Sequence, residues 1–219
     1  MLYNLPHPLS ILAQPTAKAN YNRYVQSKVT DYWESELRAK ALLLTSIPFF
    51  NPEYMSLRYP HPLWLSAGSN PFECRKAVIA ARMLSGRYPT DRLCRYWSQN
   101  KDGYCQLTAC APTQSPGSLE HLLLHCTALN LEREKLVQLC LQLSSDNPTL
   151  SSIIVPALHS DNNDHLMQLI LDCTVLPDVI RARQGYGPDV QNKLLYIGRT
   201  WCYTMHRGRL NQMGLFSYR

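Results

Sequence analysis

Apolar side chains recur at helical spacing along most of the chain. From about Lys18 to Leu44 they return every three or four residues, which predicts one long amphipathic helix. Tyr21, Tyr32 and Trp33 lie on its apolar side, and we expect them to pack in a core rather than to stack on nucleic-acid bases. No segment alternates apolar and polar residues in the manner of a strand. The pattern therefore predicts a mainly α protein.

Prolines interrupt this pattern in residues 46–71, because proline lacks the amide proton that a helix interior needs. Aromatic residues in the same stretch would be left in water by a loose linker. We therefore expect an irregular Pro-rich strap packed on the helices. The prolines concerned are Pro48, Pro52, Pro60, Pro62 and Pro71.

Capping residues mark where the next helix starts. Asn70, Pro71 and Glu73 supply a cap, a first-turn proline and a first-turn acid, and the helix is expected to run to about Leu84. Its apolar side is expected to consist of Cys74, Ala77, Val78, Ala81 and Leu84.

More helices are expected in the rest of the chain. Thr90 or Asp91 should cap a short helix that reaches Trp97. Further helices are expected over residues 129–143, 147–154, 163–173, 177–183 and 189–213. Asn163 or Asp161 is expected to cap the helix over 163–173, and glycines are expected to end the helix over 177–183.

One stretch carries a pattern of metal ligands. Cys105, Cys110, His121 and Cys126 follow the spacing C-x4-C-x10-H-x4-C. Two cysteines on a short loop, followed by a histidine and a cysteine on a helix, can surround one zinc ion as a tetrahedron. Ser118 is suited to cap that helix. The spacing therefore predicts a small CCHC-type zinc knuckle.

Alternatives remain open for this stretch. His125 could replace His121 as the nitrogen donor. The four residues could also pack separately, since free cysteines are often simply buried. Because His121 and Cys126 are five residues apart, Cys126 is expected just beyond the regular face of the helix, at its end.

The chain is accordingly expected to be an irregular helical domain in three segments. They are a lead-in, long helix and strap over 1–71, a basic helix and zinc knuckle over 72–145, and a C-terminal helical region ending in a basic helix over 146–219.

Composition limits the classes of protein to consider. A hydrophobic content of 45% with four tryptophans excludes a mainly disordered chain. No apolar run has the length of a membrane span. Eight cysteines without a recognisable secretory signal favour a reducing compartment, where thiols bind metal or stay free. Cys140 and Cys173 lie in apolar runs and are expected to pack in the core.

The net charge of +6 is unevenly distributed. Residues 75–101 and 193–219 together hold 12 of the 22 basic residues and one of the 16 acidic residues. Clustered positive charge suits a polyanionic partner. The alternative is a set of solvated helix faces that carry arginine without binding anything.

Several runs of the sequence resemble a known family, namely ARMLSGRYPTDRLCRYW, GYC and CAPTQSPGSLEHLLLHCTAL. They resemble the zinc-binding region that follows the polymerase in LINE-type (non-LTR) retrotransposon reverse transcriptases. The resemblance extends over nearly the whole chain through LPHPLSIL, VTDYWESELRAKA, PHPLW and RTWCYTMHRGRL.

This resemblance implies a C-terminal fragment of a polyprotein. Its partners would be RNA or DNA and the upstream reverse transcriptase domain of the same polyprotein. Its location would be intracellular, in the nucleus or in a cytoplasmic ribonucleoprotein. The family's metal ligands match Cys105, Cys110, His121 and Cys126, although the gap of four residues between the first two cysteines is wider than the usual two or three.

The residues that would make the fragment an enzyme are missing from the sequence. A polymerase site needs an aromatic-x-Asp-Asp turn to hold two divalent cations, and the chain has no adjacent pair of aspartates. Some relatives carry a nuclease with a Pro-Asp and a later acid-x-Lys. Two Pro-Asp pairs are present, but Gln191 stands two places before Lys193, where the acid is needed.

We therefore expect a non-catalytic module that binds zinc and grips template RNA or target DNA. The expected phosphate contacts are Arg87, Arg92 and Arg95 next to the knuckle, followed by Arg207 and Arg209. The alternative is a helical protein-interaction or scaffold fragment of a decayed element, with no nucleic-acid role.

Overall fold

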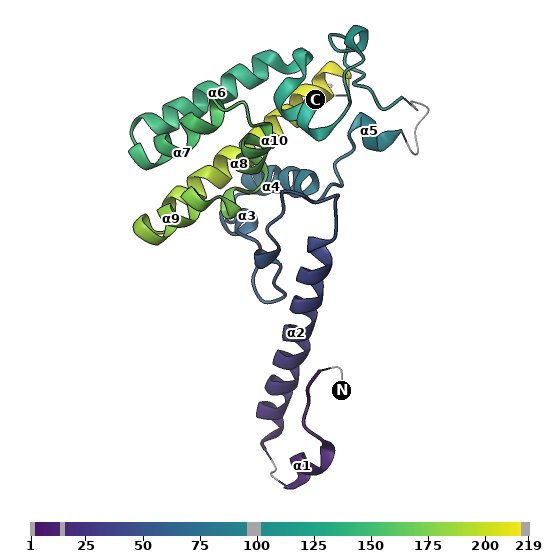
Figure 1. Ribbon diagram of the computed structural model, residues 1–219, viewed down its shortest axis with the longest axis vertical. Coiled ribbons are helices and arrows are strands. Elements are labelled where there is room, and N and C mark those ends of the chain that lie inside the picture. The colour runs from purple at the N-terminus through teal and green to yellow at the C-terminus, as the bar shows by residue number, and fades with distance from the viewer. Residues whose placement is uncertain (1–2, 14–15, 96–101, 216–219) are drawn as a thin grey trace. The chain divides into compact units, whose positions relative to one another are not determined.

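The computed structural model describes residues 3–13, 16–95 and 102–215, and over these ranges the chain is mainly helical, as the apolar spacing predicted (Figure 1). The described residues form no β-strand, and an isolated antiparallel bridge pairs Tyr104 with Pro116. None of the described helices combines the length and the apolar character needed to cross a membrane.

The chain forms two compact units. The smaller unit comprises Met1–Thr45 and Pro52–His61, and the larger unit comprises Ser46–Asn51 and Pro62–Arg219. The stretch expected to be one strap is therefore divided between the two units.

The smaller unit is built on the long helix α2 (Lys18–Leu42), which follows the short helix α1 (Pro8–Ala13). Glu34 of α2 holds the returning segment, because its Oε1 accepts hydrogen bonds from Ser56 Oγ and from the Leu57 amide, both at 2.8 Å. The bond from Ser56, followed by that from Leu57, lowers the pKa of Glu34. A single 3₁₀ turn, η1 (Pro52–Tyr54), lies in the same segment.

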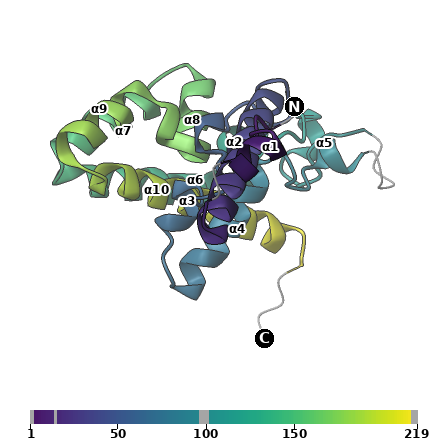
Figure 2. The same cartoon turned by 90° about the horizontal axis from the view of Figure 1, so that it is seen from below.

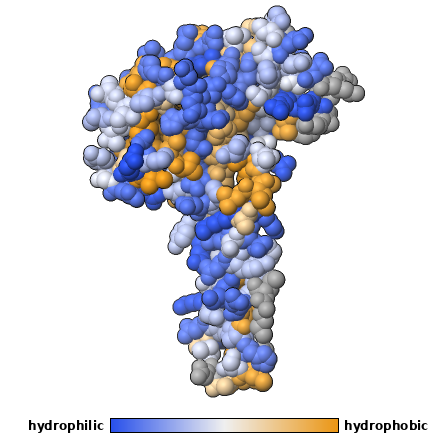
Figure 3. All heavy atoms as spheres, viewed as in Figure 1, coloured by the Kyte–Doolittle hydropathy of each residue, from blue (hydrophilic) through white to orange (hydrophobic). Residues whose placement is uncertain are grey.

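The prediction that the aromatic side of α2 packs in a core is wrong. Ala41 is the buried residue of this helix, and Trp33 is 41% exposed. Tyr32 packs edge-on against Tyr3 and Trp33, with ring centroids 5.1 and 5.4 Å away. One long helix with a short returning segment offers too little partner surface to bury a whole side. Figure 3 shows further apolar side chains on the surface of this unit, at its α1 end.

The larger unit is organised around its last helix, against which most of its other helices pack (Figures 1 and 2). The elements follow in the order α3 (Pro62–Leu65), α4 (Pro71–Leu84), α5 (Asp91–Cys94), η2 (Ala111–Thr113), η3 (His121–His125), η4 (Thr127–Leu129), α6 (Asn130–Ser145), α7 (Pro148–Leu158), α8 (Asn163–Asp172), η5 (Cys173–Val175), α9 (Pro177–Tyr186) and α10 (Asp189–Gln212). The helices in contact with α10 include α4, α6, α8 and α9.

Side chains of α10 form the centre of the core. Leu194, Trp201 and Met205 are almost completely buried, and burial of each such side chain contributes about 1.5–3 kcal/mol. Residues from 72–145 and from 146–219 share this one core. The two predicted segments are thus packed together in the larger unit.

A glycine lets α10 approach α8 closely. A Cβ added to Gly198 would lie 2.2 Å from the carbonyl oxygen of Ile170. Since this neighbour is backbone, it cannot rotate away, and only glycine fits.

The buried face of α4 differs from the predicted one. Ala77 and Leu84 are buried as expected, whereas Val78 is exposed and Cys74 is half-buried. The rest of the buried face is formed by Lys76, Ile79, Ala80 and Met83. The Asn70 cap is confirmed, because its side chain accepts hydrogen bonds from the amides of residues 72 and 73.

Other helix ends were predicted within a few residues. Asn162, rather than Asn163 or Asp161, caps α8 by accepting a bond from the His165 amide. Gly185 lies inside α9 instead of ending it. The expected reach of the α5 helix to residue 97 lies outside the described residues.

Two basic residues of the charge-rich segments are buried in ion pairs. Glu73 binds Lys76 through Oε1 and Arg199 through Oε2, each at 2.8 Å. Arg199 also donates to the hydroxyl and to the carbonyl oxygen of Ser66. These two basic side chains therefore hold α4 and α10 together and are not available to a partner.

Candidate metal centre

The four predicted ligands converge on one point. The sulfur atoms of Cys105, Cys110 and Cys126 and a ring nitrogen of His121 all lie within 4.8 Å of one another, and all four residues are buried. The sulfurs of Cys110 and Cys126 are 3.6 Å apart. Sulfurs bound to one tetrahedral ion at about 2.3 Å would be roughly 3.8 Å apart. The cluster is therefore of a size that could hold a metal ion.

A hairpin-like loop presents the first two cysteines. The Cys105 amide donates to the carbonyl oxygen of Ser115 at 2.8 Å, and the Gly117 amide donates to that of Gly103 at 2.9 Å. A Cβ on Gly117 would lie 2.5 Å from the Cβ of Asp91. Glycine is thus needed where the loop meets the start of α5.

A π-helical turn presents the last two ligands. Ser118 Oγ accepts a bond from the His121 amide, as predicted for a cap. In the turn η3 the Cys126 amide donates to the His121 carbonyl, five residues back, at 2.7 Å. Side chains five apart on an α-helix point roughly 140° away from each other, and the wider π turn brings them closer to one direction. Cys126 then leaves the helix with extended backbone, which confirms its expected place at the helix end.

The structure favours His121 over His125 as the nitrogen donor. His125 is exposed, and its Nε2 lies near Glu120 and Asn163 at 3.4 and 3.0 Å. His121 is buried, and its Nε2 has no hydrogen-bond partner among the described residues. A buried ring nitrogen of this kind is costly unless something binds the imidazole.

The thiols of the cluster influence each other. A hydrogen bond from Cys126 lowers the pKa of Cys105 to about 5 and the same interaction raises the pKa of Cys126. Cys105 therefore favours the thiolate form, which is the form that binds metal. By contrast, burial raises the pKa of Cys140 to about 11 and that of Cys202 to about 12, so these core thiols are inert.

Two side chains from the helical core hold carbonyl groups in the middle of the π turn and just after it. The indole Nε1 of Trp201 donates to the Leu123 carbonyl at 3.2 Å. Arg133 Nη2 donates to the Cys126 carbonyl at 2.8 Å, and its Nε reaches the Leu123 carbonyl at 3.5 Å. Neither residue was singled out from the sequence, because nothing local links α6 or α10 to a turn in an earlier segment.

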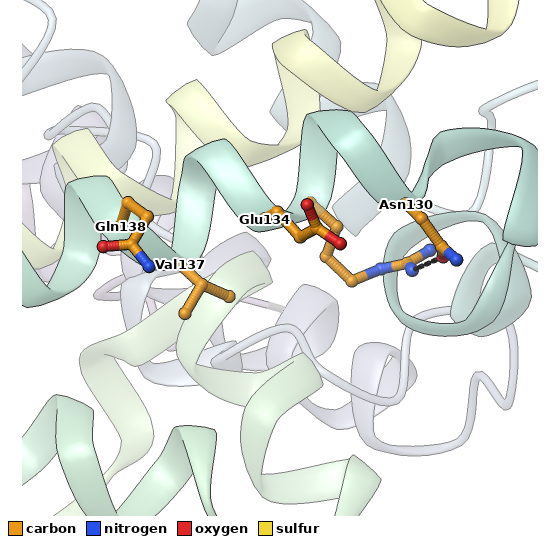
Figure 4. A pocket seen from close by; sticks show the side chains of 5 residues that line it. Asn130, Glu134, Val137 and Gln138 are labelled. Atoms are coloured by element: carbon orange, nitrogen blue, oxygen red, sulfur yellow. Dashed lines mark hydrogen bonds between the residues drawn. The ribbon is translucent and has the colours of Figure 1, made fainter.

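Arg133 borders a shallow surface cavity of about 370 Å³ along α6. Figure 4 shows Asn130, Glu134, Val137 and Gln138 lining it from this helix. The dashed line in Figure 4 marks the bond from Arg133 Nη1 to Asn130 Oδ1, at 2.7 Å.

Three of the arginines predicted to contact phosphate are exposed. Two of these lie against the loop that presents Cys105 and Cys110, called the ligand loop. Arg87, Arg92 and Arg95 are all exposed. The Arg92 amide donates to the Gly117 carbonyl at 3.0 Å, and a Cβ on Gly103 would lie 3.2 Å from the Cδ of Arg95. These side chains are placed where a partner of the loop could contact them.

Arg209 does not fit the predicted role of an exposed phosphate contact. It is 7% exposed and donates to the carbonyl oxygen of Pro89 and, at 2.9 Å, to Oδ1 of Asp91. Asp91 Oδ2 accepts a bond from the Gln106 amide at 3.4 Å. Arg209 therefore links α10 to the ligand loop. The prediction that it is an exposed phosphate contact is wrong.

Arg207 lies on a different side of α10, in a groove of about 290 Å³. Phe72 of α4 forms part of the wall and is 48% exposed. Tyr203 packs edge-on against Phe72, with ring centroids 5.5 Å apart. The groove thus combines a basic residue with exposed aromatic surface. Its other lining residues are Lys76, Glu132, Thr200, Thr204, Gly208 and Asn211.

Comparisons with protein-family models, with curated proteins and with solved structures found no match to this chain. The convergence of the four buried ligands is consequently the strongest indication of function that the chain offers.

Proposed function

We propose that this chain is a non-catalytic zinc-binding module that grips RNA or DNA for a LINE-type reverse transcriptase. The proposal includes the upstream reverse transcriptase domain of the same polyprotein as its partner and an intracellular location. The observation that carries it is the meeting of Cys105, Cys110, His121 and Cys126 within 4.8 Å of one another. The resemblance of these segments to the zinc-binding region of that family adds to it.

The ligand set supports zinc over other metals. Three sulfurs and one imidazole nitrogen in tetrahedral arrangement are typical of structural zinc sites, whereas magnesium and calcium prefer oxygen ligands. The ligands are buried and come from a loop and a helical turn, so the ion would fix the fold of the knuckle.

The exposed Arg92 and Arg95 and the half-buried Arg207 support a nucleic-acid partner. Arg92 and Arg95 adjoin the ligand loop, and Arg207 lies beside the exposed ring of Phe72. Guanidinium groups neutralise phosphates, and aromatic rings stack on unpaired bases. The combination favours a single strand over a duplex.

Metal content tests the zinc part of the proposal. We expect one zinc ion per chain by elemental analysis of protein purified without chelator. Cys110→Ser should lose the ion and the ordered structure of 105–126, because one sulfur of four is missing. Cys74→Ser is the matched control, since Cys74 lies outside the cluster. Unchanged zinc in Cys110→Ser would refute the assignment.

A salt titration tests the nucleic-acid part. Binding to a single-stranded RNA should weaken steeply with salt, and neutralising Arg92 and Arg95 together should reduce the slope of log K against log salt by roughly 1.4. Arg181→Gln, which changes an exposed arginine of α9, should leave the slope unchanged. Zinc-loaded protein without RNA or DNA affinity at low salt would favour the helical scaffold alternative.

A further inference from the structure

Three uncharged acceptors hold the guanidinium group of Arg133 at the end of the ligand-bearing turn. They are the carbonyl oxygens of Cys126 and Leu123 and the side-chain oxygen of Asn130. The strongest of these bonds, at 2.7 and 2.8 Å, come from the two terminal nitrogens. The charged group therefore has a fixed position next to a metal ligand.

Arg133 differs from the buried cations of the same unit. Lys76, Arg199 and Arg209 each pair with a carboxylate. Within the described part of the chain, the half-buried Arg133 forms no ion pair with a carboxylate. A cation partly removed from water is costly without a negative charge nearby, so an anionic group is expected at this place.

The metal ligands can supply that negative charge. Arg133 Nη2 donates to the backbone carbonyl of Cys126 at 2.8 Å, and the Cys110 sulfur lies 3.6 Å from the Cys126 sulfur, so the cation is placed beside the cluster. Three thiolates, one neutral imidazole and one divalent ion leave a single net negative charge. One guanidinium group is enough to neutralise it.

We propose that Arg133 is the counter-charge and positioning residue of the metal centre. It orients the Cys126 carbonyl, and hence the backbone that carries the last sulfur, and it balances the charge of the occupied site. This inference rests on the proposed zinc function, because the negative charge exists only when the ion holds three cysteines as thiolates. Groups that support metal ligands in this way change metal affinity by about 10- to 100-fold.

Zinc affinity of the full chain, measured by competition with a chromogenic chelator, tests the inference. We expect Arg133→Gln, which can keep a bond to the carbonyl but has no charge, to bind zinc at least tenfold more weakly. Arg133→Lys keeps the charge and should stay within about threefold of the unchanged protein. Lys135→Met removes an exposed charge from the same helix and should have no effect.

A second measurement separates coordination from folding. Cobalt in place of zinc should give the same ligand-field absorption bands in Arg133→Gln as in the unchanged protein, because the four ligands are retained. Equal zinc affinity of Arg133→Gln and the unchanged protein would overturn the inference. So would an Arg133→Lys variant as weak as Arg133→Gln, since charge would then have no role. If the unchanged protein bound no zinc, the proposed metal centre itself would fail, which is a distinguishable result.

Discussion

Replacing Arg209 by methionine should strongly destabilise the larger unit. The side chains of Arg209 and Asp91 are 9% and 13% exposed and meet at 2.9 Å. Burial alone would lower the pKa of Arg209, but Asp91 and then Tyr88 raise it overall, so this environment favours the charged form of the arginine. Removing one partner of a buried ion pair leaves the other charge uncompensated and costs about 3–5 kcal/mol. Because both side chains keep slight access to water, we expect about 3 kcal/mol.

Urea unfolding of zinc-saturated protein, followed by circular dichroism, measures this loss. The double variant Asp91→Asn, Arg209→Met should regain part of the stability, since no charge is then left without a partner. Arg92→Met is the matched control, because Arg92 is exposed in the same segment and should change stability by less than about 0.5 kcal/mol.

In RNA affinity, Arg209→Met and Arg92→Met should rank in the opposite order from their ranking in stability. Folded Arg209→Met should bind RNA as the unchanged protein does, whereas Arg92→Met should bind more weakly. The reasoning would be refuted if Arg209→Met were as stable as the unchanged protein and bound RNA less well. Arg209 would then be a surface contact after all.

Two further predictions concern the helical core. Burial alone would raise the pKa of Glu73, but hydrogen bonds from its two cationic partners lower it below its usual 4.5; its contribution to stability is therefore present above that pH and is lost on further acidification. Urea unfolding at several pH values should show that Glu73→Gln loses less unfolding free energy on acidification than the unchanged protein does. Equal losses in the two proteins would contradict the assignment of this pH dependence to Glu73. Gly198→Ala should lower the melting temperature by several degrees because of the backbone contact with Ile170. Gly185→Ala, whose added Cβ would meet no atom within 4 Å apart from the neighbouring backbone of α9, should raise stability by about 0.5–1 kcal/mol. A Gly198→Ala variant that melts like the unchanged protein would show that the two helices can separate at little cost.

The sequence predicted local features of this fold well. Asn70 and Ser118 each cap the turn they were expected to cap, because a side-chain oxygen next to free amides acts within a few residues. The convergence of Cys105, Cys110, His121 and Cys126 was also predictable, since two cysteines on a loop followed by a histidine and a cysteine on a helical turn can surround one point. In each case the chemistry is contained in one short stretch.

Features that depend on distant contacts were not predictable in the same way. Arg209 and Arg199 look like exposed charges in the sequence, and only the packing of α10 reveals their carboxylate partners. The aromatic side of α2 looks like a core stripe, but the smaller unit lacks the partner that would cover it. Arg133 gave no signal at all, because its role depends on a carbonyl group in another element.

The bond from Trp201 to the Leu123 carbonyl has an optical consequence. Trp201 is 1% exposed, whereas Trp33 and Trp64 are 41% and 40% exposed. Its fluorescence should therefore be emitted at shorter wavelength and be shielded from quenchers added to the solvent. Since the indole touches the turn that begins at His121, arrival of an ion there should change this emission. If the cluster binds zinc as proposed, the emission of Trp201 would report metal binding without an added label.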